Sequence, residues 1–416
     1  MEFGPIIKYY RLKSGITQAE LADGICSIPH LSKIENNAYS VNKETAAMLM
    51  ERLGLDINDE VERYEGLQIK LEEFIDALFY YELEKSKLLK NELLMNEEYY
   101  SKTNLVHLYH IYFARYFLLH GDSISAQQHI QIVEKNRSNL SPFEELLFQY
   151  IYGSSLYYSG KVREALDYYL NIKIKNVSSD SYISMKELSY QIALCYSVLS
   201  QSEQSIPYAQ EALVFYKEKD NYIRTIHTQM LLAINYESLE LYHEAQNTYQ
   251  IILRNTQLLN LTELYHQNLF NYALLLNDLE KLHEAIKQFK RCIDYFPSKS
   301  DNYYIAHIEL IKATRQLDSN TDKCSTISSY VEKIDGYQNA NILKQTKLLI
   351  REVELQLQNN NEKLYNFYEK EFIPFFLKEG NVKYAKKYIL LLAEWYEIKE
   401  DYKTSSFHYN KYCRLK

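Results

Sequence analysis

The chain has 416 residues, 46% of them hydrophobic, and a formal net charge of −8. This length exceeds one compact core and predicts several domains or a repeat array. The negative charge argues against a protein that coats nucleic acid or an anionic membrane. A small DNA-reading module is still compatible with it, because groove contact depends on local charge. Ten Gly and six Pro are few for this length and favour long, uninterrupted helices.

The N-terminal segment and the cysteines indicate the cellular compartment. Lys8, Arg11 and Lys13 interrupt any apolar leader, and no stretch approaches the roughly 18 apolar residues of a membrane helix. The five cysteines are scattered and never spaced as CxxC, which indicates reduced thiols rather than disulfides or zinc ligands. We therefore predict a cytoplasmic protein with no membrane partner.

Four short helices are expected in residues 1–65. The first stops at Ser14-Gly15, and the second begins with a capping box over residues 17–20, in which a Thr hydroxyl and a Glu carboxylate bind each other's backbone amides. Ser27 can cap a third helix, with Pro29 in its first turn, where a missing amide proton costs little. The fourth covers residues 42–53 and ends on a glycine.

The run ITQAELADGICSIPHLSKIEN, residues 16–36, resembles the helix-turn-helix of Xre/Cro-type repressors. It is most similar to the form found in the RRNPP family of peptide-sensing regulators, in its NprR- and PlcR-like members. The resemblance implies that the third helix enters the major groove with its N-terminal residues on base edges. It also implies a structural ion pair between Arg11 and Glu35. The DNA-binding residues that it implies are Gln18, on a backbone phosphate, with Ser27, His30, Ser32 and Lys33.

The charge of this region limits its affinity for DNA. Residues 1–65 carry seven Lys and Arg against eleven Asp and Glu, whereas residues 1–40 carry four of each. The acids therefore lie mainly in the fourth helix and the segment after it. Because phosphate neutralisation supplies most non-specific affinity, one such module would bind weakly, and two modules on a dimer are expected to act together.

An apolar stripe at three- and four-residue steps, from Leu67 to Tyr81, predicts connector helices in residues 66–100. Beyond them, small residues recur every 40 positions. One series is Gly153, Ala193, Ala233, Ala273, Ala313, Val353 and Ala393, and the second, twelve residues later, is Ala165, Ser205, Ala245, Ala285, Ser325, Tyr365 and Ser405. Small residues at two points let the paired helices of a hairpin approach closely.

The pattern resembles the tetratricopeptide repeat, whose usual length is about 34 residues. The six extra residues imply helices longer by nearly a turn each. Two units match poorly, with Tyr365 where a small residue belongs and Pro374 late in the unit. The predicted fold is all-α: a helix-turn-helix domain in residues 1–65, connector helices in 66–100, and a right-handed tetratricopeptide-like α-solenoid in 101–416 that binds peptide and dimerises.

Ligands of solenoids normally lie along the concave face. An extended peptide needs partners for its amides and carbonyls, and Asn suits this because its side chain both donates and accepts. The RRNPP resemblance implies that such residues clamp the peptide backbone. The candidates are Gln191, Asn235, Asn268 and Asn271, with Tyr236 as a wall residue that could equally be packing.

Arg115 lies inside the otherwise apolar segment FARYFLLH and would be costly to bury unpaired. It either binds a carboxylate of the peptide or pairs with a structural acid. His107 and His110, with His120 and His129 nearby, lack a third ligand at metal-binding spacing and are expected to be structural. No Gly-rich phosphate loop, HExxH or GxSxG is present, so we predict no enzymatic activity, no metal and no cofactor.

The predicted function is that of a DNA-binding transcriptional regulator, controlled by a short signalling peptide bound in the repeats, as in quorum sensing. Its partners would be double-stranded DNA with a two-fold operator, the peptide, and a second copy of the chain in a homodimer or higher oligomer. An alternative is a protein-interaction regulator that binds a phosphorelay response regulator through the connector and repeat helices. A third possibility is a solenoid scaffold with a vestigial head.

Overall fold

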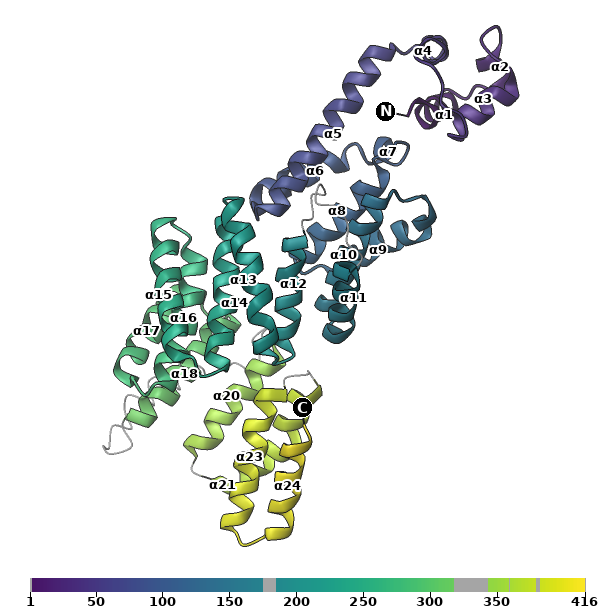
Figure 1. Ribbon diagram of the computed structural model, residues 1–416. Coiled ribbons are helices and arrows are strands. Elements are labelled where there is room, and N and C mark those ends of the chain that lie inside the picture. The colour runs from purple at the N-terminus through teal and green to yellow at the C-terminus, as the bar shows by residue number, and fades with distance from the viewer. Residues whose placement is uncertain (1, 175–184, 318–342, 359, 379–381, 416) are drawn as a thin grey trace. The chain divides into compact units, whose positions relative to one another are not determined.

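The computed structural model describes residues 2–174, 185–317, 343–358, 360–378 and 382–415. Every regular element in these ranges is a helix (Figure 1), so the predicted all-α class is confirmed. No helix among them is both long enough and apolar enough to cross a membrane. The described residues form two compact units: residues 1–199 with 207–225, and residues 200–206 with 226–416.

The first four helices are α1 (Phe3–Lys13), α2 (Gln18–Ala22), α3 (Ile28–Glu35) and α4 (Lys43–Arg52). Local hydrogen bonds explain where they begin. Thr17 and Glu20 form the predicted capping box, and the hydroxyl of Ser27 accepts the amide of His30 at the start of α3. Asn42 caps α4 in the same way. The core between these helices consists of Ile6, Ile7, Leu21, Leu31, Ile34, Ala46 and Leu49, all at most 1% exposed.

Three connecting helices follow: α5 (Ile57–Phe79), α6 (Leu83–Leu94) and α7 (Glu97–Tyr100). The predicted stripe is buried along α5 at Leu67, Leu71, Phe74 and Leu78. Helix α5 passes through residue 65 without a break. The domain limits 1–65, 66–100 and 101–416 therefore remain a proposal.

Helix pairs occupy most of the described residues that follow α7. Those of the first unit are α8 (Val106–Leu119) with α9 (Ser123–Lys135), α10 (Pro142–Tyr158) with α11 (Val162–Ile174), and α12 (Met185–Val198) with α13 (Ser202–Glu218), whose first turn belongs to the second unit. Those of the second unit are α14 (Tyr222–Ser238), whose first turn belongs to the first unit, with α15 (Tyr242–Leu258), α16 (Thr262–Asp278) with α17 (Leu282–Tyr295), and α23 (Val382–Ile398) with α24 (Tyr402–Arg414). Between them lie α18 (Asp301–Leu317) and α20 (Lys344–Leu357).

The 40-residue period is visible in the backbone. Helices α14 and α16 begin 40 residues apart, and the turns inside four hairpins place a residue with positive φ at Gly160, Ser200, Glu240 and Glu280. Small residues of both series are fully buried, including Ala193, Ala233, Ala273, Ala245 and Ala285. The predicted close approach of paired helices is therefore confirmed at these positions. Ser325 lies outside the described residues.

Gly153 shows how close this approach is. A methyl group at its Cα would lie 2.6 Å from the ring of Tyr169 on α11. That ring is fully buried, and its hydroxyl lies 2.9 Å from the hydroxyl of Ser154, so it has little freedom to move. The first helix of this hairpin thus requires glycine, where later repeats have alanine.

We expect Gly153→Ala to destabilise the protein by about 1–3 kcal/mol, because an added methyl group must displace a packed ring. Gly66→Ala is the matched control, since nothing lies within 4 Å of the Cβ that it adds to helix α5. There the same substitution should stabilise by about 0.5–1 kcal/mol through helix propensity. Urea unfolding followed by circular dichroism measures both. Equal effects of the two variants would contradict the packing explanation.

The poorly matching unit that contains Tyr365 and Pro374 has an irregular second helix. It consists of α21 (Asn361–Phe367), a π-helical segment (Tyr368–Phe372) and α22 (Ile373–Lys378). Pro374 is the second residue of α22, and it has no amide proton to donate to the preceding turn, which is the π-helical segment. A proline here therefore interrupts the regular hydrogen bonding of the helix. Tyr365 stacks on Trp395 of α23, with ring centroids 4.5 Å apart. A large residue at this position is therefore accommodated by stacking instead of by close backbone approach.

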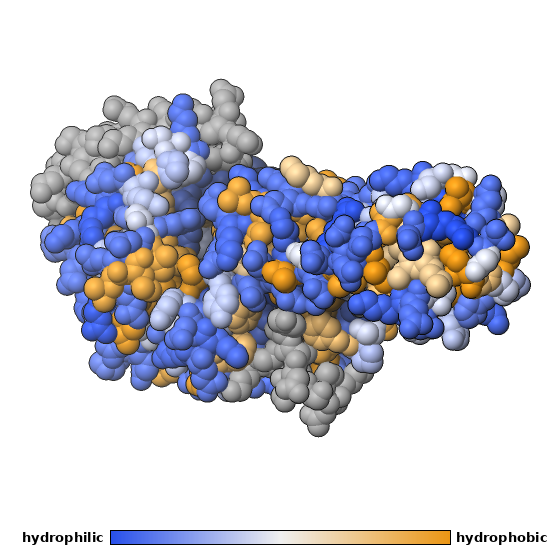
Figure 2. All heavy atoms as spheres, turned by 90° about the horizontal axis from the view of Figure 1, so that it is seen from above, coloured by the Kyte–Doolittle hydropathy of each residue, from blue (hydrophilic) through white to orange (hydrophobic). Residues whose placement is uncertain are grey.

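Figure 2 shows a surface that is mainly hydrophilic with apolar patches between. The exposed apolar side chains include Leu88 and Met95 at α6 and Tyr402 and Phe407 on α24. Scattered apolar side chains of this kind are normal on a folded chain.

Candidate DNA-binding and ligand-binding sites

Helix α3 carries most of the residues that the sequence assigns to DNA. Lys33 is exposed, Ser32 and His30 are partly exposed, and Ser27 caps the helix. The imidazole of His30 packs against the ring of Tyr39, with centroids 4.7 Å apart, so its position is held from the loop after α3. These side chains lie on one short helix, as direct readout in a major groove requires.

The ion pair expected between α1 and α3 is confirmed. Arg11 binds both carboxylate oxygens of Glu35, with Nε 2.5 Å from Oε1 and Nη2 2.9 Å from Oε2. Glu35 is 2% exposed, and a third guanidinium nitrogen donates to the carbonyl of Ile16. Burial acts to raise the pKa of Glu35, but the hydrogen bonds from Arg11 and Gln18 outweigh it, and the net pKa is lowered.

Gln18 lies at the first position of α2, as expected, but its side chain is engaged within the head. Its Nε2 donates to Oε2 of Glu35 at 2.7 Å. The predicted contact with a DNA phosphate would need this amide to turn outward. It remains a prediction.

A second polar cluster joins α1 to α5 and α7. The carboxylate of Glu60 is 4% exposed and accepts hydrogen bonds from the hydroxyls of Tyr10 and Tyr99. Arg63 donates to the hydroxyl of Tyr10 and stacks over the ring of Tyr99 at 4.4 Å. Sequence spacing did not reveal this cluster, because its members are up to 89 residues apart in the chain.

Arg115 pairs with a structural acid in this structure. Its Nη2 lies 2.8 Å from Oε1 of Glu187, and the two side chains are 7% and 1% exposed. The hydroxyl of Tyr150 also donates to Glu187, and Nε2 of Gln191 donates to that hydroxyl at 3.0 Å. Two of the candidate peptide-binding residues, Arg115 and Gln191, are therefore brought together in the first unit.

Arg224 belongs to the same buried region and was missed by sequence reasoning. It is 6% exposed, and its guanidinium stacks over the rings of Tyr81 and Tyr190 at 4.8 and 5.3 Å. The carboxylate of Glu187 acts electrostatically on Arg224 as well as on Arg115. Two buried guanidinium groups thus interact electrostatically with Glu187.

The other peptide-binding candidates lie in the second unit. Asn235 and Asn268 are fully buried, and their side-chain amides donate to the carbonyls of Leu231 and Leu264 in their own helices. Asn235 also donates to the hydroxyl of Ser205. Asn271 and Tyr236 are partly exposed. The buried pair is thus occupied within the helix packing, whereas Asn271 and Tyr236 are accessible from the surface.

Two of the four histidines, His110 and His129, pack against each other. Nδ1 of His110 lies 2.9 Å from Nδ1 of His129, and burial lowers the pKa of each imidazole to about 4, so both are neutral near pH 7. In the parts of the chain that the structure describes, no group of three or more His, Cys, Asp or Glu could hold a metal ion.

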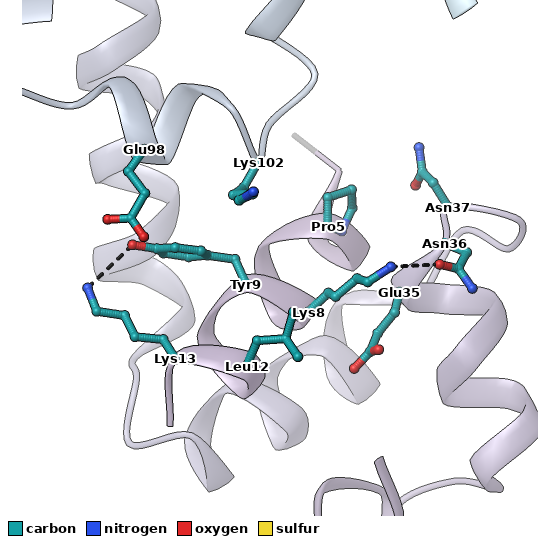
Figure 3. A pocket seen from close by; sticks show the side chains of 10 residues that line it. All are labelled: Pro5, Lys8, Tyr9, Leu12, Lys13, Glu35, Asn36, Asn37, Glu98 and Lys102. Atoms are coloured by element: carbon teal, nitrogen blue, oxygen red, sulfur yellow. Dashed lines mark hydrogen bonds between the residues drawn. The ribbon is translucent and has the colours of Figure 1, made fainter. Parts of the chain in front are cut away.

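A cavity of about 610 Å³ lies between the head and α7 (Figure 3). Its walls come from α1, from the end of α3 and from the region of α7. The lining residues are Pro5, Lys8, Tyr9, Leu12, Lys13, Glu35, Asn36, Asn37, Glu98 and Lys102. None of the residues assigned to base contact lies in it.

Known proteins resemble this chain in both of its parts. The sequence profile of the helix-turn-helix family matches residues 7–59. The transcriptional activator NprA of Geobacillus stearothermophilus is 25% identical over 414 residues, which cover 94% of this chain and 97% of NprA. The apo form of the quorum sensor NprR from B. thuringiensis superimposes with a TM-score of 0.66 and 20% identity, over 84% of this chain and 99% of NprR. This chain resembles the RRNPP-family regulators over nearly its whole length.

This chain therefore has a helix-turn-helix of the matched family followed by tetratricopeptide-like repeats, the arrangement that the RRNPP resemblance implies. A further structure, of NprR in complex with its cognate peptide NprX, matches with a TM-score of 0.64 over 84% of this chain and 98% of NprR. A shorter similarity links the chain to the regulatory protein RapD of Bacillus subtilis. The two are 30% identical over 108 residues, which are 26% of this chain and 30% of RapD.

Proposed function

We propose that this protein is a cytoplasmic DNA-binding transcriptional regulator whose activity is controlled by a short signalling peptide. One observation carries the proposal. A complete helix-turn-helix, with its caps and its Arg11–Glu35 ion pair in place, is joined to tetratricopeptide-like repeats, and the quorum sensor NprR matches the fold of 84% of this chain. The similarity to a protein named as a transcriptional activator, over 94% of this chain, supports the same function.

In the proposed complex, α3 enters the major groove of a two-fold operator. His30 and Ser32 contact base edges, Lys33 contacts a base or a phosphate, and Ser27 and Gln18 lie at the helix N-termini nearest the backbone. The acidic composition of residues 1–65 makes one head a weak binder. A homodimer or higher oligomer, formed through the repeats, would present two heads at half-sites about one helical turn apart, or a multiple of this.

The peptide is proposed to bind in the repeats. Arg115 and Arg224, which share the carboxylate of Glu187, suit an acidic group of the ligand, with Gln191 beside them. Of the candidates of the second unit, the partly exposed Asn271 and Tyr236 are proposed for its backbone. Asn235 and Asn268 are fully buried and would reach a peptide only if the helices around them moved apart. The complex of NprR with the peptide NprX, which has a similar fold, supports a peptide as the class of ligand.

Selection of DNA from a random duplex library by the full chain tests the proposal, with affinity measured in the presence and absence of a small-peptide fraction from culture medium. We expect His30→Ala to weaken binding to the selected site by about tenfold and to relax its sequence preference. Lys33→Ala should weaken it similarly and, if Lys33 binds a phosphate, reduce the salt dependence. The matched control is Lys403→Ala, which removes an exposed lysine of α24 and should leave DNA binding unchanged.

Two results would contradict the proposal. The first is a selected pool with no sequence in common, which would favour a scaffold with a vestigial head. The second is DNA affinity that no peptide fraction changes. Mass spectrometry of peptides that co-purify with the chain would identify the ligand directly.

A second candidate function is binding of a phosphorelay response regulator through the connector and repeat helices. It is supported by the similarity to RapD and to a second relative named response regulator aspartate phosphatase E, 21% identical over 169 residues. The variants above separate the two functions. Regulation that survives the loss of His30 and Lys33 would favour the interaction role, whereas its loss would favour DNA readout.

A further inference from the structure

We propose that the cavity between the head and α7 is a binding site for a small organic phosphate, which joins the DNA-reading head to the repeats. The inference goes beyond the proposed function, because it concerns neither the operator nor the peptide. It depends on which side chains line the cavity, on their charge, and on the elements that supply them.

The lining of the cavity carries more lysines than unpaired carboxylates. Lys8, Lys13 and Lys102 line it, and among the described residues no ion pair includes any of these three lysines. Lys8 donates to the side-chain oxygen of Asn36 at 2.9 Å, and Lys13 to the hydroxyl of Tyr9 at 3.3 Å, so their hydrogen-bond partners are neutral. The charge of Lys8 also acts on Glu35, which Arg11 already binds. By contrast, other lysines of the chain, such as those at positions 70, 85 and 173, have carboxylate partners.

The acids that line the cavity do not cancel this charge. Glu35 is already bound on both oxygens by Arg11. Glu98 is exposed on α7 and is the one remaining carboxylate of the lining (Figure 3). Outside the lining, the carboxylate of Glu2 accepts a hydrogen bond from Asn37. Three ammonium groups against the carboxylates of Glu98 and Glu2 leave one positive charge in excess, which favours an anion. Lysine is a common ligand of phosphate, acting as a point charge.

The size and the walls point to an organic molecule. A volume of about 610 Å³ is within the range of small-molecule sites. Tyr9, Leu12 and Pro5 supply an apolar wall along α1, and the amide side chains of Asn36 and Asn37 lie at the end of α3. Figure 3 shows Tyr9 between these groups and the α7 side of the cavity. Such a wall suits the carbon skeleton of a nucleotide or a phosphorylated metabolite.

The phosphate groups of DNA could also bind lysines, but the cavity lies away from the residues assigned to base contact. Base contact is assigned to the N-terminal half of α3, whereas Asn36 and Asn37 follow its C-terminus. An eight-residue helix spans about 12 Å between these ends. Lys8 and Lys13 belong to α1 and Lys102 to the turn after α7, so a phosphate bound by all three would hold the head against the first repeats.

Isothermal titration calorimetry on the full chain, at constant ionic strength, tests the site with pyrophosphate and with adenosine 5′-monophosphate. We expect both to bind, and we expect the double variant Lys8→Gln, Lys102→Gln to weaken binding by about tenfold. The control is Lys363→Gln, Lys403→Gln, which removes two exposed lysines of α21 and α24 and should change affinity less than twofold. Hydrogen exchange should slow in α1 and α7 when ligand is added.

Binding that depends on Lys8 and Lys102, with slowed exchange in α1 and α7, supports the site. Equal effects of the two double variants, or no binding of either probe, would overturn it. A third arm uses a random-sequence DNA duplex: if the Lys8, Lys102 variant weakens only this duplex, the lysines serve the DNA backbone and the proposal of a free phosphate is wrong. None of these results depends on His30 or on the peptide.

Discussion

We expect Glu187→Gln to destabilise the first unit by about 3 kcal/mol, because it leaves the buried guanidinium of Arg115 without a carboxylate. The side chains of Arg115 and Glu187 are 7% and 1% exposed, so water cannot replace the lost partner at low cost. Arg224, which also interacts electrostatically with Glu187, would lose a stabilising charge in the same step. Tyr150 cannot compensate, since burial raises the pKa of its phenol and keeps it neutral.

The measurement must report on the first unit. The single tryptophan, Trp395, lies in α23 of the second unit, so its fluorescence is unsuitable. Urea unfolding followed by hydrogen exchange in α8, α10 and α12 reports on the pair directly. Glu211→Gln is the matched control, because Glu211 pairs with Lys173 and both are partly exposed, at 38% and 26%. Its loss should cost at most about 1 kcal/mol. Comparable losses from the two variants would contradict the buried-pair interpretation.

A second large effect is expected in the head. Arg11→Met removes the partner of Glu35, which is 2% exposed, and should destabilise the head by about 3 kcal/mol. The double variant Arg11→Met, Glu35→Leu should recover most of this loss, because an apolar pair of similar size leaves no buried charge. Hydrogen exchange of α1 to α4 measures both variants. A double variant no more stable than Arg11→Met alone would show that the cost arises from packing.

The same ion pair has a pH dependence of known sign. Because the pKa of Glu35 is lowered in the folded chain, its contribution is fully present above its ordinary value of 4.5. It is lost as pH falls from there through the lowered, folded-state pKa. The difference in stability between the native chain and the double variant should therefore shrink below pH 4.5.

The features that the sequence alone determined are those made by neighbours in the chain. The capping box at Thr17 lies where the sequence predicts it, because it needs only a hydroxyl and a carboxylate three residues apart. The 40-residue period is equally local in origin, since each hairpin repeats the same small residues. The Arg11–Glu35 ion pair was predicted from the resemblance of residues 16–36 to the helix-turn-helix of Xre/Cro-type repressors.

Tertiary structure decided the buried polar groups. The sequence left two possible partners for Arg115, a carboxylate of the peptide or a structural acid. Its partner in the fold is Glu187, which lies 72 residues away on another hairpin. Burial of Asn235 and Asn268 depends in the same way on how neighbouring helices pack. The cluster of Glu60 with its tyrosines joins segments that are far apart in the chain and follow no sequence pattern. The same is true of the cavity lined by Lys8 and Lys102. A periodic pattern specifies which face of a helix is buried, but the partner of a charge is selected by the fold as a whole, because an unpaired charge is costly wherever packing excludes water.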